Sequence, residues 1–182
     1  MKFAIFSLLL LFLLAPTVSA AETQEGTMAA AMQKDAVEYT LPYPGLLPDS
    51  PLYPLKASRD KIIAFLIADP LKKAEFSILQ ADKRLQSGLA LVEKKKFALG
   101  QSTISKGQNY FEEALSQLGQ ARGQGLAIND TKQKLILSLN KHEELVKNKG
   151  KSLKKDQQKE WQPLLTHIHE LQKKAKDLEA KK

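Results

Sequence analysis

The sequence predicts an all-α protein, an antiparallel bundle of four or five helices that follows a proline-rich strap. Three observations lead to this prediction: apolar residues recur at steps of three and four, no stretch alternates with period two, and five of the eight prolines fall within residues 41–56. The 182 residues include no cysteine, which excludes a disulfide scaffold and a thiol nucleophile. With 43% hydrophobic and 26% charged residues, the composition is typical of one soluble globular domain.

Residues 1–20 predict a signal peptide that is cleaved after Ala20. Lys2 supplies a short basic region, residues 3–14 are apolar, and Val18 and Ala20 are the small residues that a signal peptidase requires. Because the apolar run is shorter than the roughly 18–20 residues of a membrane-spanning helix, we expect no membrane span after cleavage. The domain is therefore expected outside the cytoplasm, whether secreted, periplasmic or at the cell surface. A signal segment retained as an anchor would place it on the same side.

Two segments are expected to precede the helices. Residues 21–40 are small and polar, which predicts a flexible tether. Residues 41–56 predict a stiff, extended strap, because each proline fixes its own φ and favours extended geometry in the residue before it. We expect the strap leucines to pack on a bundle domain of residues 41–182, although the Pro-x-x-Pro spacing also suits a ligand for a partner. The structural strap residues are Pro44, Gly45, Leu46, Leu47, Pro48, Asp49, Pro51, Leu52 and Tyr53.

The first two helices are expected on either side of Asp69 and Pro70. Residues 62–68 are apolar almost all round, which predicts a central helix. Asp69 is expected to cap the second helix, with Pro70 at its first helical position. The apolar stripe of the second helix consists of Leu71, Ala74, Ile78, Ala81, Leu85, Leu89 and Val92.

Three further helices are expected after residues 94–96. The first should end at residues 123–125, which hold two glycines. The second should be capped by residues 129–131 and end at Gly150, and the last should start near Gln162 or kink at Pro163. Their apolar stripes are Phe97, Ile104, Gly107, Phe111, Ala114, Leu118 and Ala121 in the first; Leu135, Leu139, His142 and Val146 in the second; and Trp161, Leu165, Ile168, Leu171, Ala175 and Leu178 in the third.

The net charge lies in the last two helices. Residues 132–182 contain fourteen lysines and seven acidic residues, whereas the chain as a whole has a formal charge of +8. A solvated face is the favoured interpretation, and attraction to an anionic envelope polymer, a membrane surface or an acidic protein stays open. We expect no nucleic acid partner, because the chain is expected to leave the cytoplasm and these helices lack arginine forks and stacking aromatic residues.

The sequence offers no catalytic motif, so we expect neither an enzyme nor a cofactor. It has no glycine-rich phosphate loop and no Gly-x-Ser-x-Gly elbow. The candidate metal ligands are His142, His167 and Glu170, which two helices could bring together. The favoured alternative is a core histidine at position 142 that is hydrogen-bonded to a neighbour, with surface partners for the other two residues.

Several stretches carry a resemblance to a known family. They are PGLLPDSPLYPLK at residues 44–56, DPLKKAE at residues 69–75, ADKRL at residues 81–85 and, more weakly, KHEE at residues 141–144. In these stretches the chain resembles a family of bacterial and archaeal exported proteins that carry a domain of unknown function. The resemblance implies a signal peptide, a strap and a helical bundle, and relates the domain to the outer portion of some membrane-anchored anti-sigma regulators. It implies no activity.

Together these observations predict a non-catalytic extracytoplasmic interaction module. The strap is expected to fix the bundle, and the lysine-rich last helices are expected to contact an envelope protein or an anionic envelope polymer. The alternatives are a lysine-rich binder of anionic polymer or membrane surface, and a metal-responsive envelope bundle built on His142, His167 and Glu170.

Overall fold

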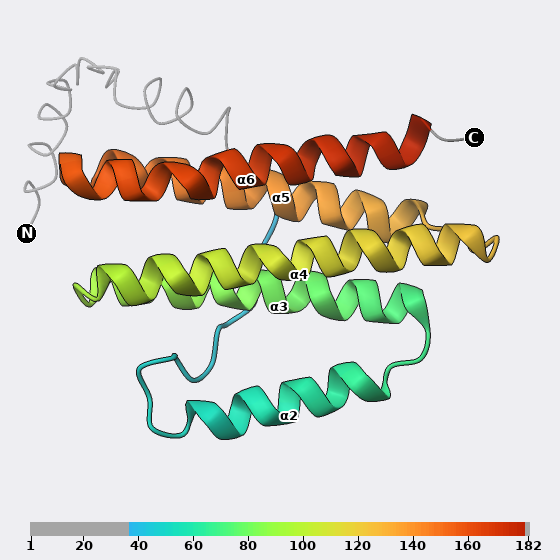
Figure 1. Ribbon diagram of the computed structural model, residues 1–182, viewed down its shortest axis with the longest axis horizontal. Coiled ribbons are helices and arrows are strands. Elements are labelled where there is room, and N and C mark those ends of the chain that lie inside the picture. The colour runs from blue at the N-terminus through green and yellow to red at the C-terminus, as the bar shows by residue number, and fades with distance from the viewer. Residues whose placement is uncertain (1–36, 181–182) are drawn as a thin grey trace, which may run out of the picture. The chain divides into compact units, whose positions relative to one another are not determined.

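The computed structural model describes residues 37–180, which form five helices and no β-strand (Figure 1). The helices are α2 (Tyr53–Leu66), α3 (Pro70–Glu93), α4 (Phe97–Gly123), α5 (Asn129–Lys151) and α6 (Lys155–Ala180). The prediction of an all-α bundle with four or five helices is confirmed. The expected signal peptide and tether residues 21–36 lie outside the described residues.

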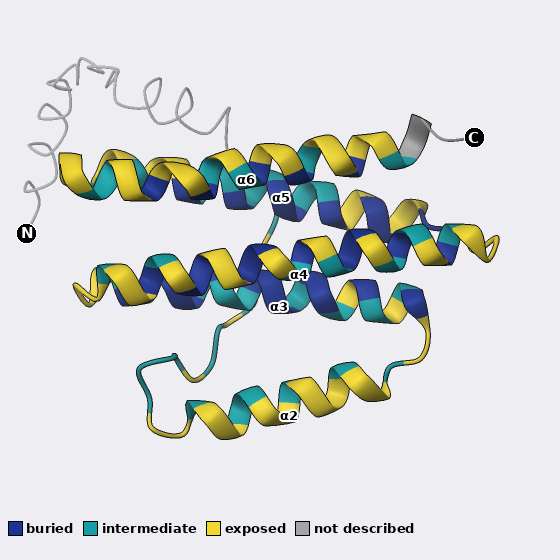
Figure 2. Cartoon of the chain, viewed as in Figure 1, coloured by how far each residue is buried: buried dark blue, intermediate teal, exposed yellow. Residues whose placement is uncertain are grey.

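Helices α3 to α6 form two antiparallel hairpins that pack on each other. Helix α3 pairs with α4 and α5 pairs with α6, while α3 also contacts α5 and α4 contacts α6 (Figure 1). The buried side chains of all four helices face the space between them (Figure 2). These are the predicted stripes, of which only six apolar members are partly rather than fully buried: Leu71, Leu89, Val92, Phe97, Leu165 and Leu178.

Three glycines allow α3 and α4 to approach closely. A Cβ on Gly88 would lie 2.7 Å from the carbonyl oxygen of Gly100, and a Cβ on Gly100 would lie 2.6 Å from the carbonyl oxygen of Gly88. At Gly107 a Cβ would lie 2.9 Å from the Cβ of Arg84. Real Cβ atoms do not come this close to other atoms, so side chains here would push the two helices apart.

The structure corrects two predicted helix starts. Helix α5 begins at Asn129 and no side chain caps it, since Ile128 occupies the N-cap position. Helix α6 begins at Lys155, not near Gln162, and runs through Pro163. Its early start places Trp161 in the core, where the indole Nε1–H donates to the carbonyl oxygen of Val146 at 2.8 Å. Helix propensity at residues 155–162 is therefore supported by core packing that the local pattern does not reveal.

The strap is shorter than predicted; Leu41 packs against the core, and polar contacts hold the residues that follow it. It ends where α2 begins, at Tyr53, because Pro54 fits the first turn of that helix. Lys56 Nζ donates to the carbonyl oxygens of Pro44 at 2.6 Å and Leu46 at 3.2 Å. Leu46 and Leu52 are 44% and 56% exposed, so the expectation that these two strap leucines pack on the bundle is wrong.

Helix α2 is not central, which is the largest correction to the predicted fold. It lies beside the α3–α4 hairpin and contains no buried residue (Figures 1 and 2). Its C-terminal end connects to α3 at Asp69, whose Oδ1 accepts a hydrogen bond from the Lys72 N–H at 3.0 Å. Pro70 follows in the first turn of α3. Within residues 37–180, no helix combines the length and apolar character of a membrane span.

Candidate interaction site at helix α2

Helix α2 exposes its largest apolar side chains to solvent. Phe65 is 85% exposed, Leu55 and Leu66 are each 71% exposed, and Ile62 is 60% exposed. At about 100° per residue, Leu55, Ile62 and Leu66 fall within about 40° of one another, with Phe65 and Ile63 on either side. We call these five residues the outward face of α2. A surface helix normally places such an apolar stripe against the core, whereas α2 places it in solvent.

The opposite side of α2 explains this orientation. The residues that face the bundle are small or polar, and they include Ala57, Asp60 and Ala64, which are partly buried. The bundle surface that they face is also polar, since α3 presents Lys73 and Arg84 there. An apolar stripe on this surface would desolvate charged groups without giving them partners, which is unfavourable.

A hollow of about 440 Å³ separates α2 from the α3–α4 hairpin. We call it the α2 hollow. Four of its lining residues are cationic and two are acidic, and an aromatic ring from each of α3 and α4 adds apolar surface. The charged and aromatic residues of its wall are Asp60, Lys61, Lys73, Phe76, Arg84, Lys106, Tyr110 and Glu113.

The cations of the α2 hollow have few counter-charges. Within residues 37–180, no carboxylate lies within ion-pair distance of Lys61, Lys73 or Lys106. Arg84 donates from Nη1 to the Tyr53 hydroxyl at 3.1 Å and from Nη2 to the Tyr110 hydroxyl at 3.4 Å, which are neutral acceptors. Its Nε is buried without a hydrogen-bond partner among the described residues. The hollow therefore favours a negatively charged group.

A second polar cluster lies inside the bundle and ties the strap to it. The Asp82 carboxylate, on α3, accepts hydrogen bonds from the Tyr39 hydroxyl at 2.7 Å, the Ser138 hydroxyl at 2.5 Å and His142 Nε2–H at 3.0 Å. Asp82 and His142 are each only 1% exposed. Residues 37–40, predicted as the end of the flexible tether, are thus part of the bundle unit, and the N–H of Val37 also donates to Glu144 Oε2 at 2.9 Å.

His142 is a core histidine hydrogen-bonded to a neighbour, as the favoured interpretation of the sequence predicts. Its Nε2 carries the proton donated to Asp82, and its Nδ1 is buried without a partner among the described residues. Its ring stands edge-on to Phe111, with 4.6 Å between ring centroids. Burial lowers the pKa of His142, and the bond and charge of Asp82 oppose this shift without overcoming it. The imidazole is therefore neutral at neutral pH.

The three candidate metal ligands do not meet. His142 contacts Asp82 in the core, and Glu170 is exposed. His167 Nδ1–H donates to Gln108 Oε1 at 3.0 Å, and its Nε2 lies 3.4 Å from Glu112. Hydrogen bonds from Lys174 and then His167 lower the pKa of Glu112. Residues 37–180 contain no group of three or more histidine, cysteine, aspartate or glutamate side chains arranged to hold a metal ion.

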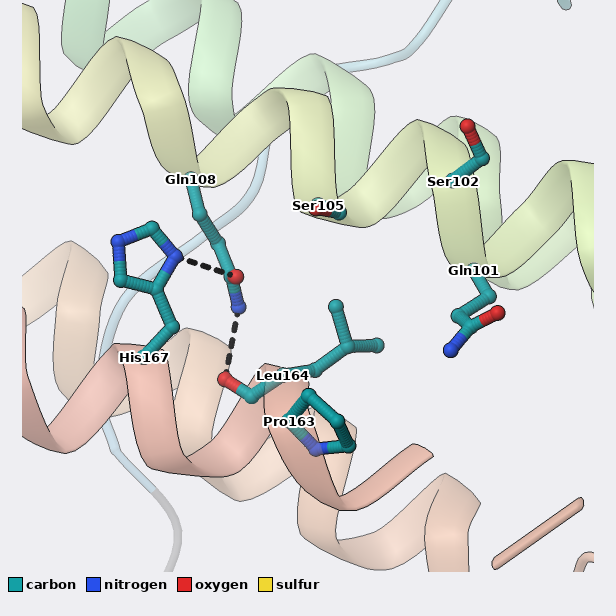
Figure 3. A pocket seen from close by; sticks show the side chains of 7 residues that line it. All are labelled: Gln101, Ser102, Ser105, Gln108, Pro163, Leu164 and His167. Carbon is teal, nitrogen blue, oxygen red and sulfur yellow. Dashed lines mark hydrogen bonds between the residues drawn. The ribbon is translucent and has the colours of Figure 1, made fainter. Parts of the chain in front are cut away.

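A second hollow, of about 410 Å³, lies between α4 and α6 (Figure 3). Gln108 crosses it, since its Nε2 donates to the Leu164 carbonyl oxygen at 2.8 Å while its Oε1 accepts from His167. Ser102 and Ser105 also line the hollow, but His167 is bonded to Gln108 and not to either serine (Figure 3). No serine here has a base positioned to activate it, so the arrangement is not that of an acyl-transfer site.

The outward face of α2 is the feature that the sequence reasoning missed. The signal was present, because placing residues 53–66 on a helical wheel separates Leu55, Ile62 and Leu66 from Ala57 and Ala64. The sequence does not show on which side of this helix the bundle lies. The cationic α2 hollow was also missed, since its lysines come from three helices.

Comparison with known families gives one match. Residues 45–181 match the family described as a domain of unknown function, DUF5667. No curated protein and no solved structure matches the chain.

Proposed function

The chain belongs to the DUF5667 family of domains of unknown function, and we propose that it is a non-catalytic, extracytoplasmic interaction module that contacts its partner through α2. The observation that carries the proposal is the outward face of α2, with Phe65 85% exposed. Apolar patches of this kind mark interaction sites on soluble proteins. This site replaces the lysine-rich last helices as the expected contact surface.

The use of the polar side chains supports a non-catalytic role. Ser138, His142 and Asp82, the residue types of a hydrolytic triad, are buried, and both Ser138 and His142 bond to the carboxylate instead of to each other. In a triad the serine must bond to the histidine. This cluster instead fixes the strap through Tyr39. The extracytoplasmic location is supported by the signal-peptide pattern of residues 1–20.

In-cell photo-crosslinking tests the proposal. A photoreactive amino acid replaces Phe65 on α2 or, as a matched control, Leu99 on α4, which is also an exposed apolar residue at 39%. We expect a dominant adduct from position 65 that the additional variant Ile62→Ser removes, and none from position 99. Absence of an adduct at position 65, or the same adducts at both positions, would contradict the proposal.

A second candidate function, binding to an anionic envelope polymer, is favoured by one end of the bundle. The α3–α4 and α5–α6 turns lie at the same end (Figure 1), where Lys149 of α5 pairs with Glu93 of α3 at 3.2 Å. The lysines gathered there are Lys94, Lys95, Lys96, Lys149, Lys151, Lys154 and Lys155. Retention on cell wall or membrane that a wash with about 0.5 M salt abolishes, together with no adduct at position 65, would favour this candidate over α2.

A further inference from the structure

We propose that the surface which covers α2 is an anionic lipid bilayer: the outward face of α2 lies in the membrane interface, and the cations of the α2 hollow hold lipid phosphates. The inference rests on the proposed function and names the partner of the same site. Two features on the two sides of α2 carry it, the apolar outward face and the cationic α2 hollow, and Lys61 lies at the boundary between them. Together they match the two chemistries that an anionic lipid combines in one molecule.

The outward face has the features of an interfacial helix. A helix of 14 residues is about 21 Å long and lies flat on a membrane without spanning it. Such helices place leucine, isoleucine and phenylalanine in the boundary between headgroups and acyl chains, with cations beside them. On α2, Phe65, Ile62 and Leu66 supply the apolar part, and Lys61 lies at the edge of the arc next to Phe65.

The α2 hollow supplies the headgroup site. Lys61 of α2, Lys73 of α3 and Lys106 of α4 line it, and no carboxylate among the described residues pairs with any of them. Next to the hollow, burial is the main cause that lowers the pKa of Lys56; the charge of Asp60 opposes this shift, and the charges of Lys83, Arg84 and Arg59 add to it. Phosphate groups that approach α2 would relieve this repulsion.

Charge argues against a second copy of the chain as the occupant. Two outward faces packed against each other would bury Arg59, whose place on the helical wheel lies within the arc, about 40° from Leu55. In each copy Arg59 pairs with Asp60 of its own helix at 2.7 Å, so packing the two faces together would take both ion pairs out of water without giving either a new partner. The formal charge of +8 also opposes self-association, whereas it favours an anionic membrane.

Vesicle co-sedimentation tests the inference. The protein is purified from an exporting host, so that all variants carry the same N-terminus, and is mixed with vesicles of phosphatidylcholine and phosphatidylglycerol. Vesicles of phosphatidylcholine alone are the uncharged comparison. We expect binding to the anionic vesicles that weakens with salt, and much weaker binding to the uncharged ones. Equal binding to both, or none to either, would overturn the inference.

Variants of the outward face test the apolar contribution. Ile62→Ser with Phe65→Ser should lower the partition coefficient by about 100-fold, since each side chain that leaves water contributes roughly a factor of ten or more. Leu99→Ser with Leu126→Ser is the matched control, because both leucines are 39% exposed and lie outside α2. The control should bind like wild type. Because α2 contributes no buried residue, the α2 variant should keep the wild-type melting temperature.

Variants of the α2 hollow test the cationic contribution. Lys73→Gln with Lys106→Gln should weaken binding to anionic vesicles by about fivefold for each lysine, and leave binding to uncharged vesicles unchanged. Lys151→Gln with Lys154→Gln removes the same charge at the other lysine cluster and should have little effect. An equal loss with both pairs would show unspecific attraction to the lysine-rich surface and overturn the inference.

The experiments separate failure of the inference from failure of the proposed function. An adduct at position 65 with a protein, without vesicle binding, would leave the interaction module in place and overturn the lipid assignment. Light scattering tests whether the protein is a dimer. A dimer that dissociates in the variant Ile62→Ser with Phe65→Ser would overturn the lipid assignment in favour of a second copy. If no adduct forms at position 65 and the protein binds no vesicles, both the lipid assignment and the proposed function are contradicted.

Discussion

The four helices α3 to α6 and the single helix α2 use similar apolar residues in opposite ways. Phe111 of α4 is fully buried and contacts His142, whereas Phe65 of α2 is 85% exposed. Both helices are amphipathic by sequence. The difference shows that apolar periodicity predicts that a helix has two faces, and the surface beside it decides which face is buried. In this protein the buried apolar side chains lie in α3 to α6, whereas α2 has no buried residue and exposes its apolar side chains.

Replacing a phenylalanine in each of the two regions should give the largest difference in the free energy of unfolding. Phe111→Ala should lower the free energy of unfolding by about 3–5 kcal/mol, because it leaves a cavity in the core. Phe65→Ala should change it by less than about 0.5 kcal/mol, because the side chain is already in water. Chemical denaturation of both variants measures the two values. A loss at Phe65 as large as that at Phe111 would mean that α2 belongs to the core.

The strap tests where the stable region begins. Tyr39→Phe removes one of the three donors to the buried Asp82 carboxylate and should cost about 1.5–3 kcal/mol, as expected for a bond to a charged group. Tyr43→Phe is the matched control, since Tyr43 is 83% exposed, and should leave stability unchanged. If denaturation shows equal values for the two variants, residues 37–40 do not contribute to the bundle.

The glycines test the close packing of α3 on α4. Gly100→Ala should destabilise the protein by about 1–3 kcal/mol, because the new Cβ would lie 2.6 Å from the Gly88 carbonyl oxygen. Gly119→Ala on the same helix has no atom within 4 Å of the new Cβ and should stabilise it by up to about 1 kcal/mol. Thermal melting distinguishes the two signs. A stabilising Gly100→Ala would contradict the close approach.

The pH dependence of stability tests the buried histidine, with the smallest effect. Because the pKa of His142 is lowered in the folded protein, the unfolded chain takes up a proton that the folded one does not as pH falls below about 6.5. Stability should therefore fall by at most about 1.4 kcal/mol per pH unit as the pH drops below about 6.5. The lowered pKa values of Glu112 and Glu143 act only below about 4.5.

The variant His142→Gln supplies the control for this prediction. Below about pH 6.5, the free energy of unfolding of this variant should depend less steeply on pH than that of the wild type. This holds even if the variant is less stable than the wild type at every pH. An unchanged slope would show that another group is responsible.

The sequence predicts the helices of the bundle well because each helix can be recognised from the spacing of its own residues. The stripe of Leu135, Leu139, His142 and Val146 is buried as predicted, since regular spacing on one helix is enough to identify a core face. The start of α6 at Lys155 is not predictable in this way. It depends on Trp161 reaching the Val146 carbonyl oxygen on another helix.

The candidate site is less predictable because it depends on partners distant in the sequence. The sequence suggests a hydrogen-bonded core histidine at position 142, but not that Asp82, sixty positions away, is its partner. The apolar character of residues 62–68 is plain, yet the exposed position of Ile62 follows from the polar surface of α3 and α4, including Lys73 and Lys106. No local pattern contains that information.

The bond between Tyr39 and Asp82 has a topological consequence. Because Asp82 lies within α3, and α3 itself begins at Pro70, the chain from Leu41 to Asp69 forms a loop with both ends fixed to the same helix. The entropy lost in closing such a loop depends only weakly on its length. Changes in the length of the segment that carries α2 should therefore cost little loop-closure entropy, while the bond between Tyr53 and Arg84 and the ion pair between Asp49 and Lys96 also hold this segment to the α3–α4 hairpin.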